Sequence, residues 1–266
     1  MGAKIQFSFS KAVMGLVLGG LSMSCNADSY EDGLMAYAVG DHALAASQFL
    51  VAAQSGNIGA EHMLARVYSE GSGVPRDNAE AMKWTKKAAD GGIALAQYNL
   101  AEMYLDNGTA DDAAAYQLYS KAAKGGVVMS YYRLGQMNEQ GRGVKADAAE
   151  AKYFYGVAAS ELDVFAQKGD AHSQNTLAAL YENGKGVAQN YARAVQWYRQ
   201  AANQGLAEAQ FNVGRMFVAG IGVDKNDLEA MGWFRRAAQQ GYSKAQAALE
   251  QMTKDGHGSV AMVSSR

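Results

Sequence analysis

The chain has 266 residues, of which 49% are hydrophobic and 10% aromatic, so it can bury a sizeable core. Its 24 basic and 26 acidic side chains leave a formal net charge of -2, a mildly acidic balance that argues against nucleic acid or an anionic membrane as the partner. A single proline in the whole chain favours an all-helical protein.

Residues 1–27 have the pattern of a signal peptide. Lys4 and Lys11 carry the only charges of this segment, and the 13 residues at 12–24 are apolar or small. That length fits the core of a signal peptide and is too short to span a bilayer. We therefore expect export, with the bacterial periplasm as the location.

The end of this segment allows two outcomes. Cys25 and Ala27, the first and third of the three residues before Asp28, are small. We therefore expect cleavage after Ala27 and a soluble mature protein. The alternative is a lipoprotein anchored at Cys25. Cleavage after Ala27 removes two lysines and no acid, which changes the formal charge from -2 to -4. It also leaves no cysteine, so the mature fold cannot depend on disulfides.

The rest of the chain is repetitive. Residues 28–56 form a shorter first unit, and five longer units with a common pattern fill 57–255, with a closing helix at 244–252. Each unit closes on a glycine, and successive closing glycines are 36, 34, 43, 36 and 36 residues apart: Gly56, Gly92, Gly126, Gly169, Gly205 and Gly241. A regular period in this range predicts an all-α, right-handed solenoid of stacked antiparallel helix pairs, and we expect a disordered tail at 256–266.

Four of the five longer units contain a Gly-x-Gly-Val loop, such as "YSEGSGVPRDN" from Tyr68 on, and the second has Asn107-Gly108 instead. A glycine pair ahead of a helix can cradle a phosphate. Here the preceding residues have helical spacing, no Lys-Ser/Thr pair follows Gly73, and the loop recurs along the chain. We interpret these loops as structural turns, in which glycine allows a positive φ at the end of the first helix.

Each second helix begins with a residue type that is preferred at helix N-caps. These residues are Asp77, Asp111, Asp147, Asn190 and Asn226. Tryptophans recur farther along the same helices, which predicts core positions. They are Trp84, Trp197 and Trp233, with Leu118 and Tyr153 assigned to the same position in the other two copies. A small residue recurs in each first helix and predicts a close helix crossing. It is Ala65, Ala101, Gly135, Ala178 or Gly214.

The second helix of the third long unit is predicted to be seven residues longer than its equivalents. Seven residues make about two α-helical turns, or ~10 Å, so the same helix face is kept. Leu162, Phe165 and Ala166 are expected to continue the apolar stripe along that face.

Paired alanines also recur in the second helix, at Ala88-Ala89, Ala122-Ala123, Ala201-Ala202 and Ala237-Ala238. Taken together, the period, the loop glycines, the caps, the tryptophan and these alanines resemble the Sel-one-like repeat (SLR), a relative of the tetratricopeptide repeat. The resemblance covers roughly residues 56–250, and the first unit is similar to a tetratricopeptide repeat. The second unit departs from the pattern in its loop, and Asn138 replaces the usual core tyrosine in the third. Exported members of this family often act as scaffolds, so the resemblance implies an interaction protein.

The first helix of each pair is expected to line a concave groove. Counting from the first alanine or serine that recurs near the start of this helix as one, which is Ala60 in the first long unit, positions three and seven lie roughly opposite the buried stripe. Position three gives His62, Tyr98, Tyr132, Asn175 and Phe211, and position seven gives Arg66, Glu102, Gln136, Ala179 and Arg215. Aromatic side chains beside charged ones suit a protein or peptide partner. The alternative is that the position-three aromatics only pack against the adjacent helix.

No residue pattern predicts catalysis, a metal or a cofactor. The four histidines are His42, His62, His172 and His257, and none lies three or four residues from another. Nucleophile elbows, HExxH motifs and calcium loops do not occur. The sequence thus favours a non-enzymatic scaffold without a membrane span. A glycan-binding module or a cell-wall hydrolase is the alternative.

Overall fold

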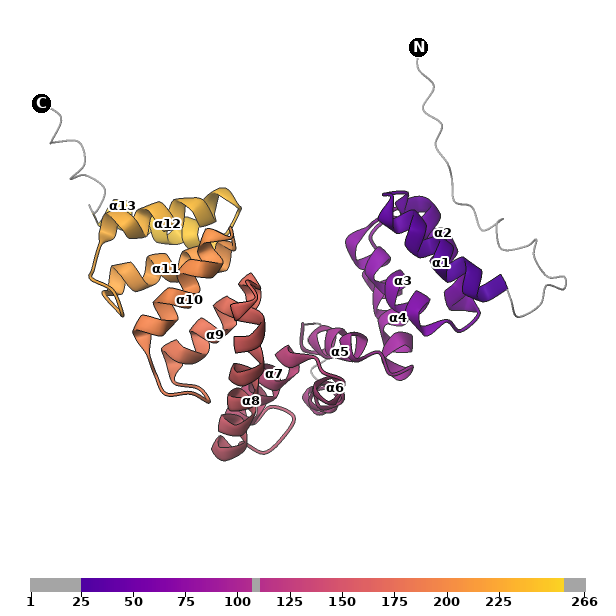
Figure 1. The fold of residues 1–266 in the computed structure, drawn as a ribbon, viewed down its shortest axis with the longest axis horizontal. Coiled ribbons are helices and arrows are strands. Elements are labelled where there is room, and N and C mark those ends of the chain that lie inside the picture. Colours follow the sequence, from indigo (N-terminus) through magenta and orange to yellow (C-terminus); the bar gives the residue numbers. More distant parts are fainter. Residues whose placement is uncertain (1–24, 107–110, 256–266) are drawn as a thin grey trace, which may run out of the picture. The chain divides into compact units, whose positions relative to one another are not determined.

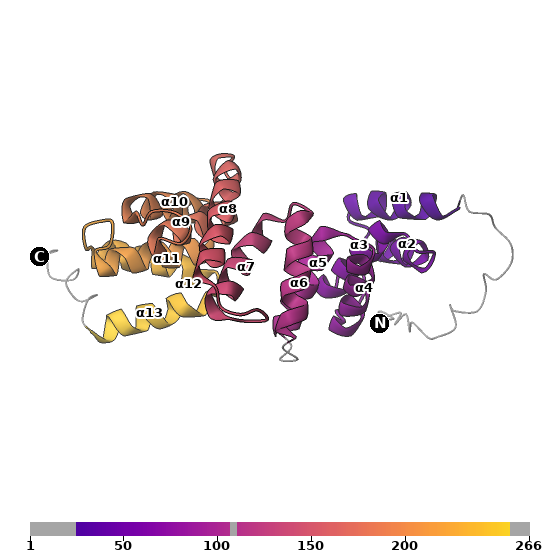
Figure 2. The same cartoon turned by 90° about the horizontal axis from the view of Figure 1, so that it is seen from below.

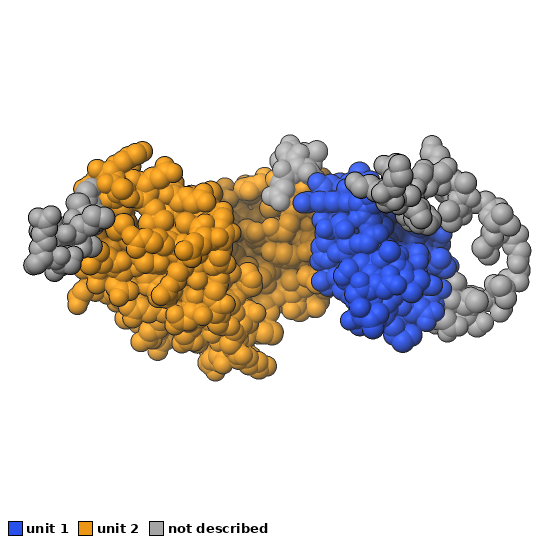
Figure 3. Space-filling model, turned by 90° about the horizontal axis from the view of Figure 1, so that it is seen from above, with its two compact units in different colours: residues 1–93 blue, residues 94–266 orange. Residues whose placement is uncertain are grey.

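The computed structural model describes residues 25–106 and 111–255, which form 13 helices and no strand (Figure 1). The chain divides into two compact units, unit 1 with residues 1–93 and unit 2 with residues 94–266, coloured separately in Figure 3. Apart from residues 25–27, the expected signal peptide lies outside the described residues. The expected tail lies outside them too.

Consecutive helices pack in pairs within each unit (Figures 1 and 2). Unit 1 contains α1 (Cys25–Ala38), α2 (His42–Gln54), α3 (Ile58–Glu70) and α4 (Asn78–Asp90). Unit 2 contains α5 (Ala94–Asp106), α6 (Asp112–Lys124), α7 (Val128–Gln140), α8 (Ala148–Gln167), α9 (Ala171–Asn183), α10 (Tyr191–Asn203), α11 (Ala207–Ala219), α12 (Asp227–Gln239) and α13 (Ser243–Lys254). The expected all-α solenoid of antiparallel helix pairs is confirmed. Among the described helices, none combines the length and the hydropathy needed to cross a bilayer.

The five predicted N-caps are confirmed. Asp77 Oδ1 accepts hydrogen bonds from the backbone N–H groups of Ala79 and Glu80, at 2.9 and 3.1 Å. Equivalent bonds to a backbone N–H two or three residues ahead are made by Asp111, Asp147, Asn190 and Asn226. Such a bond satisfies a donor that the helix itself leaves unpaired. Asp41 caps α2 in the same way, so the short first unit follows the same construction.

The glycine loops are structural turns, as predicted, and each glycine of a pair has its own role. Gly141 ends α7 with a φ of +69°, in the left-handed region that favours glycine. Gly143 also has a positive φ, of +68°, and a Cβ at this position would collide with the backbone carbonyl of Asp112 in the preceding repeat. The second glycine therefore lets the loop backbone lie directly on the previous second helix.

The buried aromatic of most repeats is one residue later than the tryptophan position. Tyr198 is 2% exposed, whereas Trp197 and Trp233 are half-buried, so the prediction of a core tryptophan is wrong for these two. It is right for Trp84, which is 3% exposed and is followed by the smaller Thr85. The other aromatic side chains at the later position are Phe49, Tyr119, Tyr155 and Phe234, all buried.

The predicted close helix crossings occur at these buried rings. A Cβ on Gly135 would lie 2.7 Å from the ring of Tyr155. A Cβ on Gly214 would lie 2.6 Å from the ring of Phe234. The small residue in the first helix therefore makes room for the buried aromatic of the second.

The long second helix is confirmed, because α8 has 20 residues and the second helices of the other long repeats have 13 each. Leu162 and Ala166 are buried, at 2% and 1% exposure, and continue the apolar stripe as predicted. Phe165 does not, since it is 44% exposed. The assignment of Tyr153 to the tryptophan position is also wrong. Counting from the Asp147 cap puts half-buried Phe154 there, and Tyr153 is 61% exposed.

Candidate functional site

In unit 1, the predicted groove residues lie on α3. Arg66 Nε donates to Glu70 Oε1 at 2.7 Å, and the guanidinium lies 5.3 Å from the centroid of the Tyr37 ring. His62 is half-buried, and burial together with the nearby Arg66 charge lowers the pKa of its imidazole. This face of α3 therefore carries a neutral imidazole beside a paired cation at neutral pH.

In unit 2, the position-three aromatics are all half-buried, and each packs at a tilt against the buried ring of its own repeat. The ring of Tyr98 lies 5.5 Å from that of Tyr119, and the ring of Tyr132 lies 5.7 Å from that of Tyr155. Phe211 repeats this arrangement with Phe234, at 5.5 Å. Each ring thus packs against the adjacent helix and still keeps a partly exposed surface.

Asn175 differs from these three residues. It is only 7% exposed, and its Oδ1 accepts a hydrogen bond from Asn212 Nδ2 of the following repeat at 3.0 Å. Its side chain connects two neighbouring repeats and offers almost no surface to a partner.

The charged residues at position seven belong to networks that join successive repeats. Glu102 accepts a hydrogen bond from the Tyr119 hydroxyl at 2.6 Å and bonds from Arg133 at 2.8 and 2.6 Å. Arg133 also donates to Gln136 Oε1 at 3.2 Å. Because Arg133 comes from the next repeat, this cluster connects two repeats through one carboxylate.

The same combination occurs three times in unit 2, and we call these clusters the Tyr–Glu–base triads. Each contains a buried tyrosine, a glutamate of the same repeat and a cation of the next repeat: Tyr119–Glu102–Arg133, Tyr155–Glu139–Lys185 and Tyr198–Glu182–Arg215. The sequence pattern did not predict that the three side chains of each triad form one hydrogen-bonded cluster. The signal available for them was the tyrosine that follows the tryptophan position.

The tyrosines of the triads hold their protons firmly. Burial, together with a hydrogen-bonded carboxylate, raises the pKa of the Tyr119, Tyr155 and Tyr198 hydroxyls well above the ordinary tyrosine value. A general acid or base works best with a pKa near the working pH. The triads therefore fit a structural role better than proton transfer.

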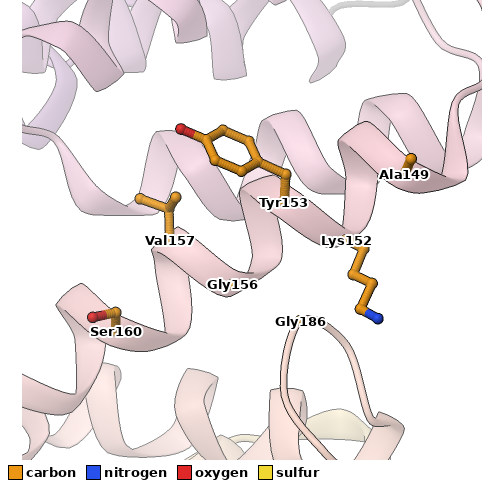
Figure 4. A pocket seen from close by; sticks show the side chains of 7 residues that line it. All are labelled: Ala149, Lys152, Tyr153, Gly156, Val157, Ser160 and Gly186. Carbon is orange, nitrogen blue, oxygen red and sulfur yellow. The ribbon is translucent and has the colours of Figure 1, made fainter.

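Two hollows, each with a cavity volume of about 560 Å³, lie along α8 and contain none of the predicted groove residues. The first lies along α8, where the ring of Tyr153 and the side chain of Lys152 project from opposite sides of the helix ribbon, near the loop at Gly186 (Figure 4). The second lies between α8 and α10 and includes Trp197. Among the described residues, no group of three His, Cys, Asp or Glu side chains is placed to hold a metal ion.

Comparisons with known proteins agree with this architecture. The family model described as the Sel1 repeat matches five segments, at 58–93, 94–127, 128–161, 171–206 and 207–242. A comparison with curated proteins gives no match.

Solved structures provide three informative neighbours. A protective antigen of uropathogenic Escherichia coli strains with an SLR fold is 33% identical, with 88% of this chain and 50% of that chain covered and a TM-score of 0.57. This chain thus spans half of the length of that protein. A Sel1 repeat protein from Oxalobacter formigenes is 26% identical, with 86% and 89% covered and a TM-score of 0.66. A putative sel1 repeat protein from Klebsiella pneumoniae is 21% identical, with 78% and 99% covered and a TM-score of 0.52, and shows the fold alone. The five matched repeats, on helix pairs of the expected construction, establish that the chain belongs to the Sel1 repeat family.

Proposed function

We propose that this protein is an exported, non-enzymatic scaffold that binds a segment of a partner protein on the face formed by its first helices. Proteins with a Sel1-repeat fold commonly mediate protein–protein interactions. The observation that carries the proposal is the row of half-buried aromatics Tyr98, Tyr132 and Phe211, which occupy one register position in three repeats of unit 2.

These rings have the properties of binding anchors. Each is held by a buried ring of its own repeat, so little side-chain entropy remains to be lost on binding. The neighbouring charges are fixed as well, because Arg215 Nη2 donates to both carboxylate oxygens of Glu182 at 2.7 Å. Aromatic and arginine side chains in a restrained arrangement are typical of interaction hot spots. In unit 1, His62 and Arg66 are proposed as contacts of the same kind, and Asn175 as a support between repeats.

Replacing both Tyr98 and Tyr132 with Ala should weaken partner capture by about tenfold or more, because truncation of one anchor commonly costs over ~1.4 kcal/mol. The measurement is a pull-down from periplasmic extract, quantified against wild type. Tyr153→Ala, which removes a 61% exposed tyrosine from α8, is the matched control and should bind normally.

Helicity and melting temperature are measured alongside. A folded double variant that captures the partner as well as wild type would place the binding surface elsewhere. A double variant that no longer folds would mean that the two rings serve the core alone.

Export is proposed on the basis of the two lysines and the 13-residue apolar stretch at the N-terminus. The intact mass of the protein purified from the periplasm of a bacterial host should correspond to a chain that begins at Asp28. A diacylated species that begins at Cys25 would establish the lipid-anchored form instead. An uncleaved protein that keeps residues 1–27 and is found in the cytoplasm would contradict export.

A further inference from the structure

The extension of α8 shifts the next repeat along this helix. The regular loop at Gly143 lies on Asp112, the residue that directly follows the Asp111 cap. The loop at Gly186 lies instead on Tyr155 and Gly156, eight and nine residues after the cap of α8. The difference of seven residues is about two helical turns, or ~10 Å.

The segment responsible lies outside the repeat pattern. The third matched repeat ends at residue 161 and the fourth begins at 171, so the last turns of α8 belong to neither. Asp163 and Gln167 from this part of the helix, and Ser160 just before it, line the hollow between α8 and α10. This hollow, which we call the α8–α10 hollow, lies between two second helices, whereas the proposed protein-binding residues lie on first helices.

The aromatic part of the α8–α10 hollow is fixed by the core. Tyr181 and Trp197 both line the hollow, and both pack against the two core clusters that meet in the fourth long repeat. Arg193 Nη1 donates to the Tyr181 hydroxyl at 3.1 Å, and its guanidinium lies 5.4 Å from the ring centroid. The rings are therefore held in place before any ligand arrives.

The polar part of the hollow consists mainly of planar amides. Gln167, Gln196 and Gln200 contribute three, and Asp163 adds a carboxylate. Gln200 Oε1 accepts from buried Gln174 Nε2 at 3.3 Å, and Gln167 Nε2 donates to Asp163 Oδ2. The one carboxylate and the one guanidinium of Arg193 cancel, so the lining has no net charge.

We propose that the α8–α10 hollow is a binding site for a neutral oligosaccharide. The indole ring of Trp197 offers an apolar face to the C–H face of a pyranose ring, and the Tyr181 ring, with the Arg193 guanidinium over it, bounds the site beside it. The amide and carboxylate groups, which together donate and accept, match the neighbouring hydroxyls of a sugar. The volume of about 560 Å³ falls within the range of roughly 300–1,000 Å³ that is usual for small-ligand sites.

A peptide ligand fits this lining less well. Small pockets that bind a peptide side chain commonly supply several aliphatic contacts or a complementary net charge. The only aliphatic side chains in the α8–α10 hollow are those of Ala159 and Val187, and its charges cancel. The proposal does not depend on the protein-binding face, because the two sites share no residue.

The test is isothermal titration calorimetry of the full chain with three neutral trisaccharides, namely cellotriose, maltotriose and triacetylchitotriose. At least one should bind with a Kd below about 1 mM. Trp197→Ala should weaken that binding by about tenfold or more. Trp233→Ala is the matched control, since Trp233 is half-buried at the same repeat position and does not line this hollow. It should change the affinity by less than about twofold.

Gln196→Ala provides a second variant, because Gln196 is exposed and its loss leaves the core intact. It should also weaken binding, by about threefold or more, with unchanged helicity. The proposal is overturned if none of the three trisaccharides binds, or if Gln196→Ala and Trp233→Ala leave the affinity equally unaffected. It is also overturned if a peptide library yields a ligand whose binding depends on Trp197 while the sugars do not bind.

Discussion

Replacing Gly143 with Ala is expected to destabilise the protein by about 2–5 kcal/mol, one of the largest effects available to a single methyl group in this chain. Two costs add at this residue. The φ of +68° lies in the left-handed region, and the new Cβ would collide with the Asp112 carbonyl oxygen, which belongs to the backbone and cannot rotate away. The measurement is denaturant unfolding followed by circular dichroism.

Gly126→Ala is the matched control, because it separates the two costs. Gly126 has a φ of +87°, and nothing lies within 4 Å of the position of its missing Cβ. The free energy of unfolding of this variant should fall only by the cost of backbone strain, about 1–2 kcal/mol. Equal losses in the two variants would mean that Gly143 is needed only for its positive φ, and that the close approach of the loop to α6 is relaxed at little cost.

Tyr198→Ala is expected to cost about 3–5 kcal/mol, as for other truncations of a buried aromatic. Tyr198 is 2% exposed, and its hydroxyl donates to Glu182 Oε2 at 2.9 Å. Tyr198→Phe should cost less, about 1–3 kcal/mol, because the ring still fills the core and only the hydrogen bond to a charged group is lost. Denaturant unfolding at pH 7 measures both.

Trp197→Ala is the control for this second prediction, since it removes a larger ring from the neighbouring position of the same helix. Trp197 is half-buried, so its truncation should cost less than that of Tyr198. A larger loss of stability for Trp197→Ala than for Tyr198→Ala would mean that the tryptophan contributes more to the core than the aromatic at the next position. If Tyr198→Phe is as stable as wild type, the hydrogen bond from Tyr198 to Glu182 contributes no net stability.

Features that depend on a few neighbouring residues could be predicted from the sequence. The Asp147 cap, the helix end at Gly141 and the helix pairs themselves are of this kind, because capping bonds and backbone φ preferences act over two to four residues. The extra seven residues of α8 were also visible, since they break an otherwise regular period. Repetition strengthened each inference, because a local signal that recurs in five units is hard to mistake.

The sequence could not show which of two adjacent aromatic residues is buried in the core. Trp197 and Tyr198 differ by one residue, or about 100° around the helix axis, and either ring is apolar enough for a core. The neighbouring helix decided the outcome, because the pocket above a small first-helix residue receives the later ring. The same reason applies to Tyr153, which a shift of one residue places on the exposed side of α8.

The repeat, its helices and its turns follow from the sequence alone, because each of them depends on local chemistry and a fixed period. The side-chain contacts between successive repeats depend on the tertiary structure. Glu102 and Arg133 meet across 31 residues of sequence, and Asn175 and Asn212 across 37, so no local pattern could pair them. The α8–α10 hollow also depends on contacts between repeats. The extra two turns of α8 shift the position at which the next repeat packs on it, and only the packed structure shows which side chains of α8 and α10 then face each other.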